Sequence, residues 1–340
     1  MAALVAAAGC GGSNTITTND AVGETLAVYS SLPLQGPWAA VSEQIVGGEK
    51  LALAQAGGRA GRFKVAYVSL DDSNPASGQW SPGVAATDAK TAAQDTSTIA
   101  YLGDYDSGAT AISLPLINGA GILQISPGSP YVGLTQALDA GQDEPGRFYP
   151  TGHRTFVRLP PGDPVEALAQ VQLMRNLCLF RVYVIDDQDQ FDVALATLVA
   201  AEAQRAGIAV AAHDSLAVTA GGAYTGEAEK VIESGAQAVF FSGTTGEGAI
   251  TLWRQLREAD PHLALLGSSS LANEAFVSQI GSAGEDAYIA SPALPARFYP
   301  PAGRRVLSAY EKEFGTPAEA YVLFGYEAMS MVLDAIRKAG

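Results

Sequence analysis

Small and hydroxyl-bearing residues follow two apolar segments of the chain. The segment 99-IAYLG-103 is followed by Asp106, Ser107 and Gly108, and the segment 121-GILQIS-126 is followed by 127-PGSP-130. Hydroxyl and backbone N–H groups at the N-terminus of a helix can hold a polar ligand, a carboxylate in particular. Ordinary turns and helix caps use the same residue types. The elements around these two loops must therefore decide between binding and simple turn formation.

Apolar segments at regular intervals predict the strands that position these loops. Ala-rich segments that end near Gly, Asn or Pro lie between most of them and predict helices. This alternation predicts parallel strands covered by helices. It occurs twice, in 25–156 and 181–290, so we predict an α/β fold with two doubly wound parallel-sheet lobes and a hinged cleft. The predicted strands are 25–31, 63–70, 99–103, 121–126, 181–187, 208–215, 238–243, 263–269 and 287–292.

Two proline-rich connectors mark the crossings between the lobes. The first is 158-RLPPGDP-164, and the second, 291-SPALPARFYPP-301, precedes two predicted helices at 302–314 and 317–338. We therefore assign 25–157 plus 292–340 to lobe I and 158–291 to lobe II. In open parallel sheets, ligands bind beyond the carboxyl ends of the strands, where both candidate loops lie.

Composition excludes several classes of function. The chain has 340 residues and a net charge of −15, which argues against nucleic acid and against anionic lipid surfaces as partners. Its length and its 48% apolar content suit two domains of ordinary size. No segment reaches the roughly 18 uninterrupted apolar residues of a membrane span.

Motifs for catalysis, metals and cofactors are incomplete. The nearest match to a nucleophile elbow, 267-GSSSL-271, lacks the final glycine. His153, His213 and His262 are far apart in the sequence, and the acidic segment 186–192 lacks the glycine and terminal Glu of a calcium loop. We predict no enzyme, no metal and no cofactor.

The two cysteines suggest no disulfide framework. Cys10 follows 1-MAALVAAAG-9, which resembles the end of a bacterial lipoprotein signal peptide, although no basic residue precedes it. We expect Cys10 to carry a lipid anchor and 1–24 to be a signal remnant and linker. Cys178 lies in an apolar stretch and is expected to be buried and inert.

The chain resembles the type I periplasmic binding proteins, in particular the Leu/Ile/Val-binding receptors of branched-chain amino acid ABC importers. The resemblance runs from Thr25 to Gly340. It is carried by the collinear order of 26-LAVYSSLPLQGP-37, 65-VAYVSLDDSNP-75, 101-YLGDYDSGATAISLPLINGAGILQISPGSPYVGLT-135 and 184-VIDDQDQF-191.

The resemblance implies a set of ligand-binding residues. Ser107 takes the position of the hydroxyl donor to a ligand carboxylate, and Gly128 and Ser129 take the second loop. Tyr105 and Trp38 take positions in the wall and lid of the pocket. From lobe II it implies Phe191, where relatives often have a Tyr that closes over the ligand, and the loop positions Thr244 and Ser269.

Three positions depart from the family pattern. Pro130 stands where a Thr is usual, and Thr244 replaces a Tyr. Ser269 replaces the Glu that pairs with a ligand ammonium, so a carboxylate or neutral polar ligand stays open beside an amino acid. The candidate substitutes for that Glu within the chain are Asp104, Asp106, Asp187 or Asp189, among which the sequence does not choose. The first-lobe disulfide common in relatives is also absent. The strands that close the second lobe in relatives are absent as well, since the chain stops after a predicted helix at Gly340, which suggests a truncated chain.

The resemblance implies an extracytoplasmic, monomeric solute-binding receptor that delivers a branched-chain or related amino acid, or a small carboxylate or amide, to ABC permease subunits. It would attach to the membrane only through its lipid. Closure would be a hinge motion near 158–164 and 291–301. Two alternatives remain open from sequence: a ligand sensor of the same fold that feeds a signalling partner, and an α/β hydrolase.

Overall fold

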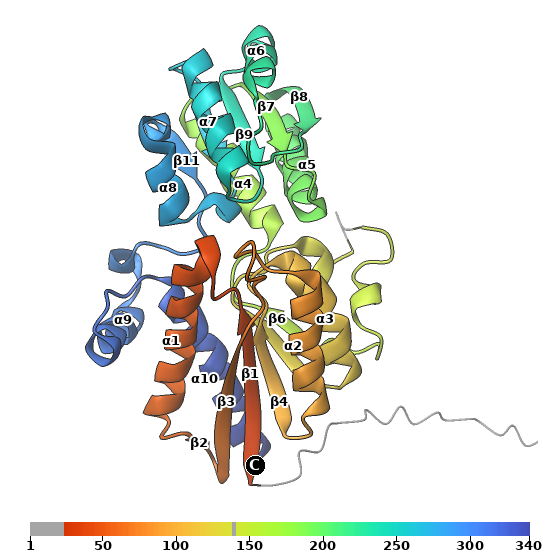
Figure 1. Ribbon diagram of the computed structural model, residues 1–340, viewed down its shortest axis with the longest axis vertical. Helices are drawn as coiled ribbons and strands as arrows, with labels where there is room; N and C mark the ends of the chain where they lie inside the picture. The colour runs from red at the N-terminus through yellow and green to blue at the C-terminus, as the bar shows by residue number, and fades with distance from the viewer. Residues whose placement is uncertain (1–23, 138–140) are drawn as a thin grey trace, which may run out of the picture.

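The computed structural model describes residues 24–137 and 141–340, which form two α/β lobes stacked along the long axis of the molecule (Figure 1). The sheet of lobe I has the strand order β2-β3-β1-β4-β5-β6, and all neighbours are parallel except β2 with β3. Its strands are β1 (Thr25–Leu32), β2 (Arg59–Ala60), β3 (Phe63–Asp71), β4 (Thr98–Gly103), β5 (Leu123–Ser126) and β6 (Phe156–Arg158).

The sheet of lobe II is parallel throughout, with the order β11-β10-β9-β7-β8. Its strands are β7 (Arg181–Asp186), β8 (Ala209–Ser215), β9 (Ala238–Ser242), β10 (Ala264–Gly267) and β11 (Ala287–Ile289). Two parallel sheets flanked by helices confirm the predicted fold class.

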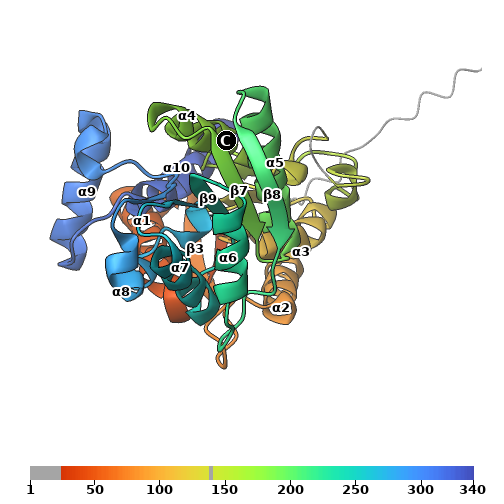
Figure 2. The same cartoon turned by 90° about the horizontal axis from the view of Figure 1, so that it is seen from above.

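Helices cover both sheets. Lobe I carries α1 (Ala39–Gln55), α2 (Pro82–Gln94), α3 (Ser107–Gly119), α9 (Pro301–Phe314) and α10 (Tyr321–Ala339). Lobe II carries α4 (Asp163–Asn176), α5 (Gln190–Arg205), α6 (Thr225–Glu233), α7 (Glu247–Ala259) and α8 (Glu274–Ile280). Seen along the long axis, α9 lies at the edge of the molecule, outside α1 and α10 (Figure 2). Among the helices of the described residues, none has the length and apolar character to cross a membrane.

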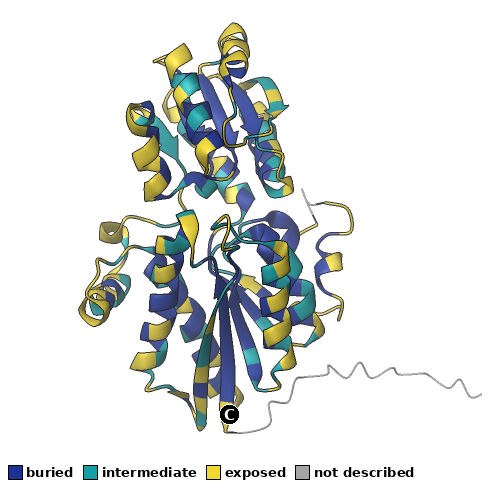
Figure 3. Cartoon of the chain, in the orientation of Figure 1, coloured by how far each residue is buried: buried dark blue, intermediate teal, exposed yellow. Residues whose placement is uncertain are grey.

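All nine predicted strands are present, each within a few residues of its expected bounds. Central strands of a parallel sheet are buried on both faces, so they appear in sequence as continuous apolar runs. Figure 3 shows the central strands of both sheets as buried. Two strands were not predicted, β2 and β6, because two or three residues are too short to form such a run.

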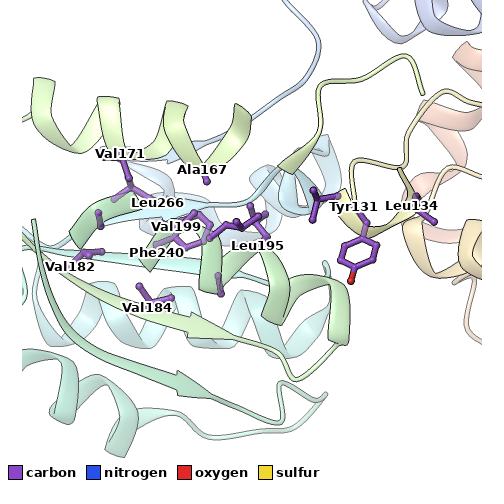
Figure 4. Packing of buried hydrophobic residues seen from close by; sticks show 14 of the residues in the cluster. Tyr131, Leu134, Ala167, Val171, Val182, Val184, Leu195, Val199, Phe240 and Leu266 are labelled. Atoms are coloured by element: carbon purple, nitrogen blue, oxygen red, sulfur yellow. The ribbon is translucent and has the colours of Figure 1, made fainter. Parts of the chain in front are cut away.

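One hydrophobic cluster joins the lobes. Tyr131 and Leu134, from the segment that follows β5, belong to the same buried cluster as Val182, Val199 and Phe240 of lobe II. Figure 4 shows Tyr131 beside the helices of lobe II. The segment after β5 therefore contributes to the core of both halves.

The prediction for Cys178 is wrong, because its thiol is exposed. Cys178 lies two residues beyond the end of α4 and has a φ of 57°. A residue in this left-handed conformation turns the chain at the helix end, where the backbone faces water. Cys10 and nearly all of the segment 1–24 lie outside the described residues.

Candidate functional site

A cavity of about 250 Å³ lies between the lobes, and both contribute to its walls. Most of the loops that form it follow strands, because the carboxyl ends of parallel strands meet at one edge of each sheet. Lobe I contributes the loops after β4 and β5, and lobe II those after β7, β9 and β10. The crossover segments at Pro160 and Pro292 also line the cavity. This places the cavity where the sequence predicts a cleft.

Seven of the eight predicted ligand-binding residues line this cavity. Residues separated by more than 200 positions in the sequence are therefore brought to one space. The seven are Trp38, Tyr105, Ser107, Gly128, Phe191, Thr244 and Ser269.

Ser107 is the first residue of α3 and is buried. Its Oγ accepts a hydrogen bond from the backbone N–H of Tyr131 at 3.2 Å, which orients the hydroxyl and leaves its hydrogen to donate. Asp106 caps the helix, and its Oδ1 accepts from the N–H of Gly108 at 2.8 Å. A side-chain carboxylate of the protein therefore already occupies part of the helix N-terminus.

Ser129 is fully buried behind the cavity wall, and it does not contribute to the lining. Its Oγ lies 2.7 Å from Thr110 Oγ1 and donates to the carbonyl oxygen of Asp104 at 3.1 Å. Ser126 supports the same loop, since its Oγ accepts from the N–H groups of Gly128 and Ser129. The hydroxyl of Ser129 thus holds the loop in place and presents Gly128 to the cavity.

Pro130 lines the cavity and acts through its carbonyl group. That oxygen accepts hydrogen bonds from the Arg158 guanidinium and from the N–H of Asp163, the latter at 3.0 Å. Arg158 also donates to Thr135 Oγ1 at 2.8 Å. Pro130 cannot donate to a ligand, but it ties the second loop to the crossover that leads into lobe II.

Lobe II presents Phe191, Thr244 and Ser269. The Phe191 ring meets the Tyr131 ring edge to face, with centroids 4.9 Å apart, so it forms a contact across the lobes. The N–H and hydroxyl groups of Thr244 both donate to Asp187 Oδ2, at 2.8 and 3.1 Å.

Glu166 is a site residue that sequence reasoning missed. The backbone N–H of Ser269 donates to Glu166 Oε1 at 2.8 Å, so a carboxylate lies where the family Glu is replaced by Ser269. The two residues are 103 positions apart, and no local pattern joins them. Trp80 and Tyr321 were missed for the same reason, since they reach the cavity from an extended loop and from the start of α10.

The ionisable side chains that line the cavity are acidic. Five carboxylate residues line it, and among the described residues no Lys, Arg or His does. Burial raises the pKa of Asp106 to about 6, against the lowering effect of the Gly108 N–H, and the charges of Asp189 and Asp187 add to the rise. Burial likewise raises the pKa of Asp163 to about 7, with a further contribution from Glu166. The five are Asp106, Asp163, Glu166, Asp189 and Asp192.

The three histidines lie outside the cavity lining. His213 Nε2 lies 2.8 Å from Asp186 Oδ2, and the other two are exposed. Over residues 24–137 and 141–340, no group of three or more His, Cys, Asp or Glu side chains is placed to hold a metal ion.

Gly108 lets an aromatic ring form the cavity wall. A Cβ at this position would lie 2.4 Å from Cζ2 of Trp80, well inside van der Waals contact. We expect Gly108→Ala to displace Trp80, to change the intrinsic tryptophan fluorescence and to lower the free energy of unfolding by about 1–3 kcal/mol.

Fluorescence and urea unfolding would measure both effects. Gly83→Ala is the matched control, because a Cβ there meets nothing within 4 Å and also lies in the first turn of a helix. An unchanged fluorescence spectrum in Gly108→Ala would contradict this role for Gly108.

Comparison with known proteins identifies the architecture. The family profile described as "Periplasmic binding protein" matches residues 30–340. The "Leucine-, isoleucine-, valine-, threonine-, and alanine-binding protein" of Pseudomonas aeruginosa is 27% identical over 161 residues, which are 47% of this chain and 42% of that protein. The matched region thus spans less than half the length of this curated relative.

Solved structures share the fold at low sequence identity. A leucine-binding protein from Thermotoga maritima superposes with a TM-score of 0.74 at 18% identity, over 92% of this chain and 83% of that one. A solute-binding protein of an ABC transporter from R. palustris, in complex with 4-hydroxybenzoate, superposes with a TM-score of 0.75 at 13% identity, over 93% and 81% of the two chains.

Proposed function

The chain belongs to the periplasmic binding protein family, and from that premise we propose that it is the extracytoplasmic solute-binding receptor of an ABC importer. It would close its two lobes over a small polar solute, an amino acid or a related compound, and deliver it to permease subunits. The observation that carries this proposal is the cavity of about 250 Å³ with walls from both lobes. Cavities of this kind suit small ligands, because aromatic walls exclude water while a few polar groups orient the molecule.

The names of the relatives support a solute of this size. The Pseudomonas aeruginosa relative is named for five amino acids, and one solved structure of the same fold holds an aromatic carboxylate. The groups around the cavity support binding rather than turnover, since the described histidines lie outside the lining and the Ser107 hydroxyl is oriented by a backbone N–H group, that of Tyr131. We propose a receptor without catalytic activity.

As part of the same proposal, the chain divides into two lobes that move relative to each other. Each half would contain one sheet, with α10 returning to pack on lobe I, and the hinge would lie in the crossovers at 158–164 and 291–301. The lipid anchor at Cys10 and the monomeric state stay predictions.

A thermal-shift screen tests the proposal, because a ligand that binds only the folded protein raises its melting temperature. The screen contains amino acids, their amides, amines and aromatic acids, followed by calorimetric titration of each compound that stabilises the protein. Binding of at least one such solute with a stoichiometry of one is the expected result. If no compound of these classes stabilises the protein, the receptor proposal is contradicted.

Ser107→Ala tests the first loop. We expect it to weaken binding of the solute found in the screen by about tenfold, since the loss of one hydrogen bond to a polar ligand group costs on the order of 1–1.5 kcal/mol. Calorimetric titration measures the change. Ser282→Ala, an exposed serine remote from the cavity, is the control and should bind as the parent does. Equal affinities for Ser107→Ala and the parent would remove Ser107 from the site.

A further inference from the structure

We propose that the ligand carries an organic cation, an ammonium or guanidinium group, and that this cation lies between Asp106 of lobe I and Asp189 and Asp192 of lobe II. The inference rests on the proposed receptor function and names the chemical class of its ligand. It reverses the expectation of a ligand carboxylate as the main polar anchor in the first loop. We call these three residues the interlobe carboxylates.

The helix N-termini at the cavity already hold carboxylates of the protein. Asp106 Oδ1 accepts from the N–H of Gly108 at the start of α3, and Asp189 Oδ1 accepts from the N–H of Phe191 at the start of α5, each at 2.8 Å. The partial positive charge of a helix N-terminus is therefore matched twice by side chains. A ligand carboxylate placed there would meet two negative groups.

Negative charge from the two lobes meets across the cavity. Burial raises the pKa of Asp106 and of Asp192, and the charges of Asp187 and Asp189 add to the rise at both; that of Asp106 adds to it at Asp192. Asp72 lies behind the wall of lobe I and is fully buried, and burial raises its pKa to about 9, so it adds no charge at neutral pH. Like charges on opposing lobes resist closure, and a cation between them removes that resistance.

The remaining walls suit an organic cation better than a metal ion. Trp38, Trp80, Tyr105 and Tyr321 present aromatic rings to the cavity, and ring faces attract ammonium and guanidinium groups. No group of side chains in the described ranges has a metal-binding arrangement. The nearby Arg158, which interacts with Asp163, is bound to Pro130 and Thr135 and is not part of the lining.

Matched compounds separate the charge of the ligand from its shape. Leucinamide keeps the amine of leucine without its carboxylate, and 4-methylpentanoate keeps the carboxylate without the amine. Putrescine, agmatine and choline extend the cations in size, and calcium chloride represents a metal ion. We expect one or more of the organic cations to raise the melting temperature, and 4-methylpentanoate and calcium to leave it unchanged.

Variants test the position of the cation. Asp106→Asn and Asp189→Asn keep a helix-capping oxygen but lose the charge, so the fold should persist. Each is expected to weaken binding of the stabilising cation by about tenfold or more, and added salt should weaken binding to the parent. Asp260→Asn is the matched control, because Asp260 Oδ1 accepts a backbone bond in a loop remote from the cavity.

Lobe closure gives a readout that needs no ligand. We expect the double variant D106N/D189N to have a smaller radius of gyration than the parent in small-angle X-ray scattering at low salt, because the repulsion between the lobes is reduced. An unchanged radius would overturn the repulsion argument.

The outcomes distinguish this inference from the receptor function itself. If 4-methylpentanoate or another anion stabilises the protein and no organic cation does, the receptor function stands and the cation proposal falls. Stabilisation by calcium alone, or full affinity for a cation in Asp106→Asn and Asp189→Asn, also overturns it. If no compound of any charge binds, the failure lies with the receptor function.

Discussion

Gly325→Ala is expected to lower the free energy of unfolding by about 3 kcal/mol and to weaken solute binding as well. A Cβ at position 325 of α10 would lie 1.9 Å from the carbonyl oxygen of Ile45 in α1. The same crossing holds Gly48, whose Cβ would lie 2.1 Å from the carbonyl oxygen of Val322. Overpacking of a close contact typically costs about 1–3 kcal/mol, and more where backbone must move on both sides.

The α1–α10 contact also positions the cavity walls. Trp38 directly precedes α1, and Tyr321 is the first residue of α10, so separation of the helices moves both rings. Urea unfolding and calorimetric titration measure the two effects. Gly226→Ala in α6 is the control, since a Cβ there meets nothing within 4 Å and should leave stability equal or slightly higher. A Gly325→Ala protein as stable as the parent would show that the helices can separate at little cost.

Glu49→Gln is expected to stabilise the protein at pH 8 by on the order of 3 kcal/mol and to flatten its pH dependence. Glu49 in α1 is fully buried, and burial raises its pKa to about 8, although the hydrogen bond from Tyr67, the nearby Ser30 hydroxyl and the charge of Lys50 lower it. The Tyr67 hydroxyl donates to Oε2 at 2.5 Å, while Oε1 has no hydrogen-bond partner among the described residues. The site therefore suits a neutral side chain.

The direction of the pH dependence follows from the pKa of Glu49 in the folded and the unfolded protein. The folded protein keeps the Glu49 proton up to about pH 8, whereas the unfolded chain releases it near pH 4.5. This group's contribution to stability is therefore complete below pH 4.5 and decreases by up to about 1.4 kcal/mol per pH unit between pH 4.5 and 8. Glutamine has no proton to release, so this part of the slope disappears, and its amide can donate toward Ser30.

Urea unfolding of parent and variant between pH 5 and pH 8 measures this difference. Glu43→Gln provides the control, because Glu43 lies exposed on the same helix and its replacement should leave the slope unchanged. Parallel stability curves for Glu49→Gln and the parent would rule out a buried protonated Glu49.

Local sequence predicted the strands and most of the cavity loops. A central parallel strand needs apolar residues on both faces, so nine strands were found from uninterrupted apolar runs, including β9 with Phe240 and Phe241. The loops at their carboxyl ends must converge at one edge of each sheet, which placed Ser107, Gly128 and Thr244 at one cavity. Cys178 was misread because an apolar run was continued through a left-handed turn.

The direction of each side chain depended on contacts that are distant in sequence. Serine is a residue type that often binds ligands, yet hydrogen bonds with Thr110 and Asp104 hold the Ser129 hydroxyl inside lobe I. Glu166 gives no local signal, yet it lies against Ser269.

The sequence by itself therefore determined the two-lobed α/β architecture and the strand ends that face the cleft, because burial and periodicity are properties of neighbouring residues. Only the tertiary structure decided the charge of the cavity. The acidic residues of the lining come from the starts of three separate helices, and they act on one another only when the two lobes face each other. They include Asp106, Glu166, Asp189 and Asp192.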